Sequence, residues 1–148
     1  LVDFTRPELD AAGIRVELAL EERAPEILMD PRYIKQAVLN IIKNAIAAMP
    51  EGGSLSVSTE SRGGRLRLSV ADTGVGIPEE NLDKIFEPYF TTKDFGSGLG
   101  LTLVYKIIKE HLGEVEVVSK IGEGATFTLS FPVPQKEKHL IAYREEGQ

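Results

Sequence analysis

The stretch SLSVSTESRGGRLRLSVADTGVGIP, residues 54–78, decides the fold class because it contains two strands, the turn between them and an acidic loop. Apolar and polar residues alternate on both sides of the Gly-Gly pair, which is typical of a β-hairpin with one buried face. Asp72 ends the second strand, and the glycines after it would let the backbone approach a neighbouring group closely. The residues of the second strand that we expect in the core are Leu66, Leu68 and Val70.

The rest of the chain adds further strands and two long helices. The first helix starts at Pro31 with Asp30 as its expected N-cap, and the second ends at Gly113. The pattern predicts an α/β (α+β) sandwich, in which a mixed, largely antiparallel sheet of about five strands is covered on one face by about three helices. Strands are expected at 14–20 and 26–30, in the hairpin 54–72, and at 114–120 and 124–133; helices are expected at 31–49 and 99–113, with a short one within 78–90.

The composition excludes several classes of function. The chain has 148 residues, of which 42% are hydrophobic and 27% charged, as is usual for a globular domain. It contains no cysteine, so a disulfide framework and a thiolate metal site are both excluded. No apolar run approaches the ~20 residues of a membrane helix. The net charge of −6 argues against a general nucleic-acid surface, so a bound polyanion would be held locally by amides, a metal ion or a few lysines.

Two asparagines, Asn40 and Asn44, lie four residues apart in the first long helix and therefore on one of its faces. Asparagine is a poor helix former and is unfavourable to bury without partners. One interpretation is that the pair caps the helix or joins a buried amide network. The other is that Asn44 supplies an oxygen ligand to Mg²⁺, with Asn40 beside it and Lys43 near phosphates, since Mg²⁺ takes oxygen donors and often keeps substrate phosphates as ligands.

The acid at the end of the strand has two interpretations as well. A buried carboxylate of Asp72 would accept a hydrogen bond from an exocyclic amine such as N6 of adenine, whereas a simple Asp-x-Gly turn needs no ligand. A third motif, GSGLGL at 96–101, opens a helix with glycines, and its amides and helix dipole favour phosphate. It is not a P-loop, because no Gly-Lys-Ser/Thr follows, and its G-x-G-x-G spacing does not match a dinucleotide fingerprint.

Five segments in a fixed order make the pattern specific. They resemble the N box, first glycine box, F box, second glycine box and last strand of the catalytic ATP-binding domain of sensor histidine protein kinases. That family belongs to the GHKL superfamily and has the Bergerat ATP-binding fold. The resemblance covers residues 14–132, and NAIAAMPEGG is closest to the nitrogen-regulation type. The segments are NIIKNAIAAM (40–49), DTGVGIP (72–78), IFEPYFTTK (85–93), GSGLGLTLVYKII (96–108) and GEGATFTLSFP (122–132).

The resemblance implies a role for each matching residue. Asn44 would bind Mg²⁺, and catalytic roles are implied for Asn40, Lys43 and Lys93. Which lysine contacts phosphate is open, because Ala47 stands where many relatives have a lysine. Phe86 and Phe90 would anchor a mobile lid. The positions implied to bind ATP are Asn40, Asn44, Asp72 at the adenine amine, Gly74, Gly76, Ile77, Phe90, Thr91, Thr92, Lys93, Gly96, Ser97, Gly98, Leu99, Gly100, Leu101 and, near the base, Thr126.

The resemblance implies a protein-histidine kinase that uses Mg²⁺ and ATP. The γ-phosphoryl group would pass to a histidine on a separate dimerisation domain of the same kinase, for relay to the receiver domain of a response regulator. Gyrase-type relatives place a water-activating glutamate where this chain has Asn40, and an amide cannot act as a general base. The alternatives are a self-sufficient ATPase, a nucleotide-binding module without catalysis, and a serine kinase acting on an anti-sigma-type partner.

The expected organisation has three parts. Residues 1–13 would be the end of a linker from a preceding helical hairpin, 14–133 the catalytic domain with its lid at 81–97, and 134–148 a charged tail. His111 is expected to be a surface residue or to interact with the C-terminal helix dipole. The isolated domain should be monomeric and cytoplasmic, with no nucleic-acid partner and no direct membrane contact.

Overall fold

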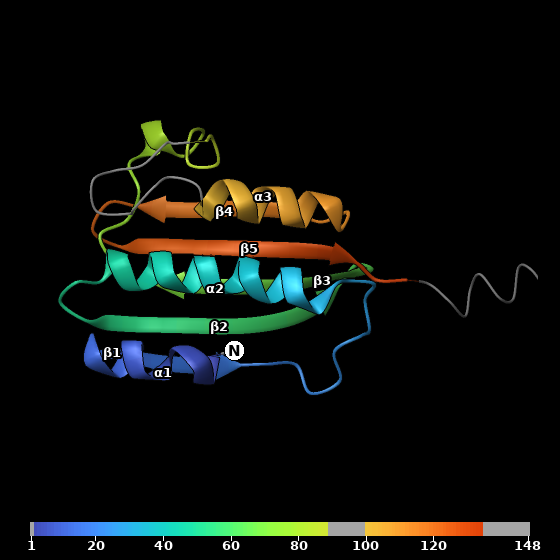
Figure 1. The fold of residues 1–148 in the computed structure, drawn as a ribbon, viewed down its shortest axis with the longest axis horizontal. Coiled ribbons are helices and arrows are strands. Elements are labelled where there is room, and N and C mark those ends of the chain that lie inside the picture. The colour runs from blue at the N-terminus through green and yellow to red at the C-terminus, as the bar shows by residue number, and fades with distance from the viewer. Residues whose placement is uncertain (1, 89–99, 135–148) are drawn as a thin grey trace, which may run out of the picture.

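The computed structural model describes residues 2–88 and 100–134, which form one five-stranded sheet with the helices on one of its faces (Figure 1). The strand order is β1-β2-β3-β5-β4, with β1 parallel to β2 and the other neighbours antiparallel. The predicted sandwich with its mixed, largely antiparallel sheet is confirmed. The elements are α1 (Val2–Ala11), β1 (Ile14–Ala19), α2 (Pro31–Ala48), β2 (Gly53–Arg62), β3 (Arg65–Asp72), η1 (Glu79–Asn81), α3 (Gly100–Glu110), β4 (Glu114–Lys120) and β5 (Gly124–Pro132).

The predicted hairpin lies at the centre of this sheet. β2 and β3 are joined through Gly63 and Gly64, whose φ angles of 61° and 76° suit the two central positions of a tight hairpin turn. The register pairs Leu55 with Asp72 at the far end from the turn. The hairpin therefore places the carboxylate of Asp72 at the end of a central strand, where the loop 73–78 begins.

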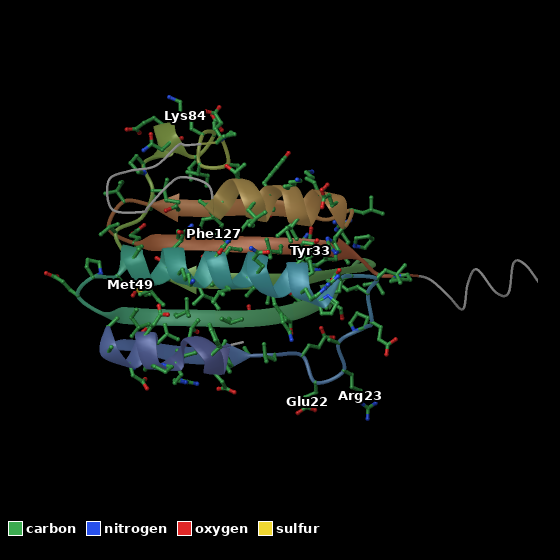
Figure 2. All side chains as sticks on the ribbon, viewed as in Figure 1. Glu22, Arg23, Tyr33, Met49, Lys84 and Phe127 are labelled. Carbon is green, nitrogen blue, oxygen red and sulfur yellow. The ribbon has the colours of Figure 1, made fainter. Side chains whose placement is uncertain are left out.

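The core lies between the sheet and the helices, and it includes Met49 and Phe127, which are labelled in Figure 2. α2 turns its apolar stripe to the sheet and also packs against α3. Burying one large aliphatic side chain of this kind stabilises a fold by about 1.5–3 kcal/mol. Of the core residues expected in β3, Val70 is buried, Leu68 packs against the core from its edge, and Leu66 is only half-buried. The large aliphatic residues that are fully buried include Leu9, Ile41, Ile42, Leu55, Ile108 and Leu129.

The strand expected at residues 26–30 does not form, and this prediction is wrong. The segment connects β1 to α2 without regular structure. Its apolar residues Leu28 and Met29 are 80% and 46% exposed, so the run is not buried as a strand of the sheet would be. Pro25 and Pro31 flank the run and limit pairing at both of its ends.

The helices differ from the expectation in two further places. α1 occupies most of the segment expected to be linker, and its Thr5 and Leu9 are fully buried, so this segment contributes to the core. Between 78 and 88 the only helix is the short η1. Within the described ranges, no helix has both the length and the apolar character needed to cross a bilayer. The boundaries proposed for linker, catalytic domain, lid and tail stay predictions.

Candidate functional site

α2 carries the two asparagines that the sequence singled out. The helix starts after Asp30, whose side chain accepts a hydrogen bond from the N–H of Arg32 at 3.0 Å, and Pro31 occupies the first turn. Asn40 and Asn44 lie in the helix interior beside the buried stripe, and both are half-buried. The interpretation that they cap the helix is therefore wrong.

The two amides differ in their partners. The Nδ2 of Asn40 donates to the carbonyl oxygen of Gly100 at 3.4 Å, which connects α2 to the first residue of α3. The side chain of Asn44 makes no hydrogen bond to any residue in the described ranges. A half-buried amide oxygen without a partner is available to a ligand or a cation. The described residues contain no cluster of three or more His, Cys, Asp or Glu that could hold a metal ion by itself.

Asp72 is buried at the end of β3, with 8% of its surface exposed. Its Oδ1 accepts hydrogen bonds from the backbone N–H groups of Gly74 at 2.9 Å and Ala125 at 3.2 Å. No residue that the structure describes donates to its Oδ2. Burial raises the pKa of Asp72 above its usual 3.8, and the two backbone bonds oppose this effect only in part. One carboxylate oxygen is thus held by the turn, while the other is free to accept a hydrogen bond from a ligand.

The glycines after this acid are required by contacts within the chain itself. A Cβ at Gly74 would overlap the carbonyl oxygen of Ala48, and one at Gly76 would overlap that of Lys120. The same loop is hydrogen-bonded to the end of α2 and to the turn between β4 and β5. The N–H of Val75 donates to Ala48 at 3.0 Å, and the carbonyl of Val75 accepts from the turn between β4 and β5 at 2.8 Å. The sequence led us to expect glycines that make room for a ligand, but these contacts need glycine whatever is bound.

Replacing Gly76 by alanine should therefore lower the free energy of unfolding by about 2 kcal/mol, measured by chemical denaturation. Its φ of 77° is unfavourable for any other residue, and the new methyl group would meet the backbone of Lys120. Gly122 is a matched control, because its φ is 80° but a Cβ there would meet nothing within 4 Å. Its alanine variant should lose only about 1 kcal/mol. Equal losses would show that the contact with Lys120 is unimportant.

The segment before the undescribed part of the chain is attached to α3. Phe86 packs against the core, and its ring lies 5.5 Å from that of Tyr105, centroid to centroid. The hydroxyl of Thr102 donates to the carbonyl oxygen of Phe86 at 3.0 Å. Phe86 itself is therefore held to the first turns of α3, and its role as the anchor of a lid stays a prediction.

The structure accounts for only part of the predicted nucleotide site. Gly100 begins α3, Ile77 and Leu101 pack against the core while partly buried, and Lys43 is exposed. Asn40 and Asn44 lie on α2. The loop that follows Asp72 lies at the end of the sheet next to the last residues of this helix. The predicted residues Phe90, Thr91, Thr92, Lys93, Gly96, Ser97, Gly98 and Leu99 lie outside the described residues.

Thr126 is not brought to the buried carboxylate. In the sheet it pairs with Ala71 and Val118, so its side chain lies on the face opposite to that of its neighbour Ala125. Val118 is 72% exposed, which marks this as the uncovered face. Ala125 is buried and donates its N–H to Asp72, so Ala125 rather than Thr126 lies beside the carboxylate, and a contact of Thr126 with the base stays a prediction.

Ser119 near the end of β4 and Gly124 at the start of β5 also hold the loop 73–78, and neither was predicted from the sequence. The Oγ of Ser119 accepts from the N–H of Ile77 at 2.8 Å and donates to the carbonyl oxygen of Gly124 at 2.8 Å. Gly124 has a φ of 98°, and a Cβ there would overlap the carbonyl oxygen of Asp72. These contacts hold the loop 73–78 to β4 and β5, whereas Val75 bonds it to the end of α2. Two glycines in the turn GEG were the only sequence signal for this role.

The chain matches a known family over most of its length. Residues 29–135 match the model described as histidine kinase-, DNA gyrase B- and HSP90-like ATPases. The chain is 38% identical over 135 residues to sporulation kinase E of Bacillus subtilis (strain 168), which covers 90% of this chain and 18% of that protein. It is 43% identical over 126 residues to the sensor histidine kinase ZraS of Escherichia coli (strain K12), covering 85% of this chain and 27% of ZraS. The chain thus spans only a small part of these curated relatives.

Solved structures share the fold. The catalytic domain of histidine kinase ThkA is similar with a TM-score of 0.79 and 33% identity, over 89% of both chains. Full-length ShkA in complex with AMPPNP has a TM-score of 0.80 and 34% identity, over 88% of this chain and 28% of ShkA. ThkA in complex with the response regulator protein TrrA has a TM-score of 0.76 and 30% identity, over 89% of this chain and 38% of that one.

Proposed function

The chain belongs to the family of histidine kinase-, DNA gyrase B- and HSP90-like ATPases, and we propose that it works as the ATP-binding catalytic domain of a sensor histidine kinase. The family that the five sequence segments indicate is confirmed, whereas their closeness to the nitrogen-regulation type stays a prediction. One observation carries the proposal. The buried carboxylate of Asp72 has one free oxygen, and the loop that follows it is hydrogen-bonded to the end of α2. The same helix bears Asn44, whose side-chain amide has no partner among the described residues.

In this proposal Asp72 binds the adenine of ATP. Its free Oδ2 accepts a hydrogen bond from the exocyclic amine, and that bond replaces part of the solvation that burial removes. The loop has little room to move, because Gly74 is packed against the backbone of Ala48 and Gly76 against that of Lys120. Ile77 at its end packs against the core and offers an apolar contact to the ring. The rigid loop would therefore recognise an adenine by one hydrogen bond and by shape.

The phosphates would lie between α2 and the start of α3. Asn44 offers the half-buried oxygen that Mg²⁺ accepts, and the phosphates and water would supply its remaining ligands, because no described acidic cluster does. When bound, Mg²⁺ neutralises charge on the phosphates. At Gly100, the first turn of α3 has backbone N–H groups without helical partners, which favour anions. The candidate cations are Lys43, which is exposed, and Lys93, outside the described residues.

Transfer to a protein acceptor fits this site better than hydrolysis does. Asn40, where gyrase-type relatives are expected to carry glutamate, is an amide that cannot take a proton from water. Phosphoryl transfer requires mostly positioning and charge neutralisation, which the two asparagines and a lysine would provide. In this proposal the histidine that accepts the phosphoryl group belongs to another domain. Both ring nitrogens of His111 are engaged within the chain, and His139 lies outside the described residues.

The partners proposed follow from this chemistry. The histidine would belong to a dimerisation domain of the same kinase, and the receiver domain of a response regulator would accept the phosphoryl group next. A response regulator is bound to ThkA in one solved complex, which supports the second partner. We expect the isolated domain to be monomeric, to act in the cytoplasm, and to contact neither nucleic acid nor the membrane directly.

The proposal is tested by incubating the domain with γ-labelled ATP, Mg²⁺ and a separately prepared histidine-bearing hairpin of the parent kinase. The expected result is label on the hairpin that is lost in acid and kept in base, as for phosphohistidine. Acid-stable label would indicate a serine kinase. Rapid release of labelled phosphate without the hairpin would indicate a self-sufficient ATPase, and bound ATP with neither product would indicate a binding module.

A further inference from the structure

The imidazole ring of His111 joins the end of α3 to the start of α2. Its Nε2 lies 3.0 Å from the backbone N–H of Asp30, and its Nδ1 lies 2.8 Å from the carbonyl oxygen of Ile107. A neutral ring meets both contacts in one tautomer, in which Nδ1–H donates to Ile107 and Nε2 accepts from Asp30. His111 is half-buried. The expectation of a simple surface or dipole residue is therefore incomplete.

The residue that His111 holds is the N-cap of α2. The carboxylate of Asp30 accepts the hydrogen bond of the Arg32 amide and also pairs with the guanidinium of Arg32. The hydrogen bond from the Arg32 side chain is the main reason that the pKa of Asp30 is lowered. The backbone N–H of Asp30 has its partner in His111, the residue that follows α3. The bond from His111 thus fixes where α2 begins relative to α3.

A second bond joins the same two helices at the other end of their contact. There the side chain of Asn40 donates to the carbonyl oxygen of Gly100. In Figure 1 the two helices lie next to each other over the sheet, and they run in opposite directions because residue 30 meets 111 and residue 40 meets 100. The two bonds are separated by about 15 Å along the helix axis. Between the two bonds α2 and α3 pack through buried apolar residues, whose attraction is not directional, so the hydrogen bonds add directional contacts at both ends of this packing.

We propose that His111 is a positioning residue for the phosphate-binding part of the site. By holding the end of α3 to the N-cap of α2, it helps to set the position of Gly100 relative to Asn44. Along the helices, Gly100 lies about 16 Å and Asn44 about 21 Å from the bond between His111 and Asp30. This inference rests on the proposed function, in which the phosphates and Mg²⁺ lie between these two residues. The adenine contact at Asp72 is built on β3 and on the turn between β4 and β5, so it does not depend on this bond.

Two substitutions separate the bond between helices from the bond within α3. In His111→Gln the side-chain oxygen can reach the place of Nε2 and accept from Asp30. In His111→Asn the shorter amide can replace only Nδ1 and keeps just the bond to Ile107. We expect the Asn variant to bind ATP about three- to tenfold more weakly, as for loss of one neutral hydrogen bond, and the Gln variant to stay within about twofold of the natural protein. Affinity for adenosine should not change in either variant.

The control for general loss of stability is Arg65→Ala. Arg65 donates to the hydroxyl and carbonyl oxygens of Ser130, at the end of β3 far from Asp72, and contacts neither helix through these bonds. It should leave the affinity for ATP unchanged at a temperature where all variants are folded. Equal ATP affinity in the Asn and natural proteins, or an equal loss in the Asn and Gln variants, would overturn the inference. A parallel loss of adenosine affinity would do so too. If the natural protein bound no ATP, the proposed function would fail as well.

Discussion

Replacing Asp72 by asparagine should weaken ATP binding by about 30- to 150-fold, equivalent to about 2–3 kcal/mol for a lost hydrogen bond to a charged group. The carboxylate has one oxygen committed to two backbone N–H groups and one left for the adenine amine. An asparagine has one acceptor for these two tasks, so in either orientation its NH₂ group faces another donor. Isothermal titration calorimetry with ATP and with adenosine should show similar losses, because the contact is to the base.

The same variant should gain stability relative to the natural protein as the pH rises. Burial raises the pKa of Asp72 in the folded protein above the usual 3.8, so between these two pKa values the folded protein holds a proton that the unfolded chain has released. The free energy of unfolding of the natural protein therefore falls as pH increases from 3.8 through the raised pKa, and this contribution is constant above it. Asparagine does not titrate, so urea denaturation should show the variant gaining on the natural protein across that window.

Asp10→Asn makes the same chemical change at an exposed position of α1. It should alter neither the affinity for ATP nor, beyond about 0.5 kcal/mol, the free energy of unfolding. If Asp72→Asn bound ATP normally, the carboxylate would be only the Asp-x-Gly turn that the sequence also allows. A stability difference that did not change with pH would show that the carboxylate is better solvated than its burial suggests.

Local patterns predicted the fold wherever they were long. The Gly-Gly turn and the alternation around it fixed the hairpin, and the Asp-Pro start with its apolar stripe fixed α2. The predictions that failed concerned short segments or segments whose structure depends on contacts distant in the sequence. Residues 26–30 were apolar enough for a strand but lie between prolines and remain partly exposed. α1 is stabilised by the burial of Thr5 and Leu9 against the rest of the fold, and no local sequence pattern predicts that burial.

The site was predicted to a smaller extent, because its geometry is set across the chain. The identities of Asn40, Asn44 and Asp72 could be read from helical spacing and the end of a strand. The true neighbour of the carboxylate depends on the register of β5, in which Ala125 and Thr126 face opposite ways. The contact of His111 with Asp30 spans 81 residues of sequence, and such a contact leaves no periodic signal.

Replacing Asn44 by alanine should reduce phosphoryl transfer to the hairpin by at least about 100-fold, the usual effect of removing one group that stabilises transition-state charge. Mg²⁺ should no longer improve the affinity for ATP, since the proposed oxygen ligand is gone. The fold should not suffer. The amide has no hydrogen-bond partner among the described residues, and alanine is the better helix former by about 0.5 kcal/mol, so the melting temperature should stay level or rise slightly.

Gln36→Ala is the matched control for this variant, because it removes an exposed amide from the same helix away from the site. It should transfer phosphoryl groups at the natural rate and gain similar helical stability. The contrast matters because activity lost without stability lost identifies a residue kept for a ligand, whereas a structural amide would lose both together. Normal Mg²⁺-dependent transfer by Asn44→Ala would show that Asn44 is not the metal ligand. A large fall in the melting temperature of this variant would support the alternative that Asn44 belongs to a buried amide network.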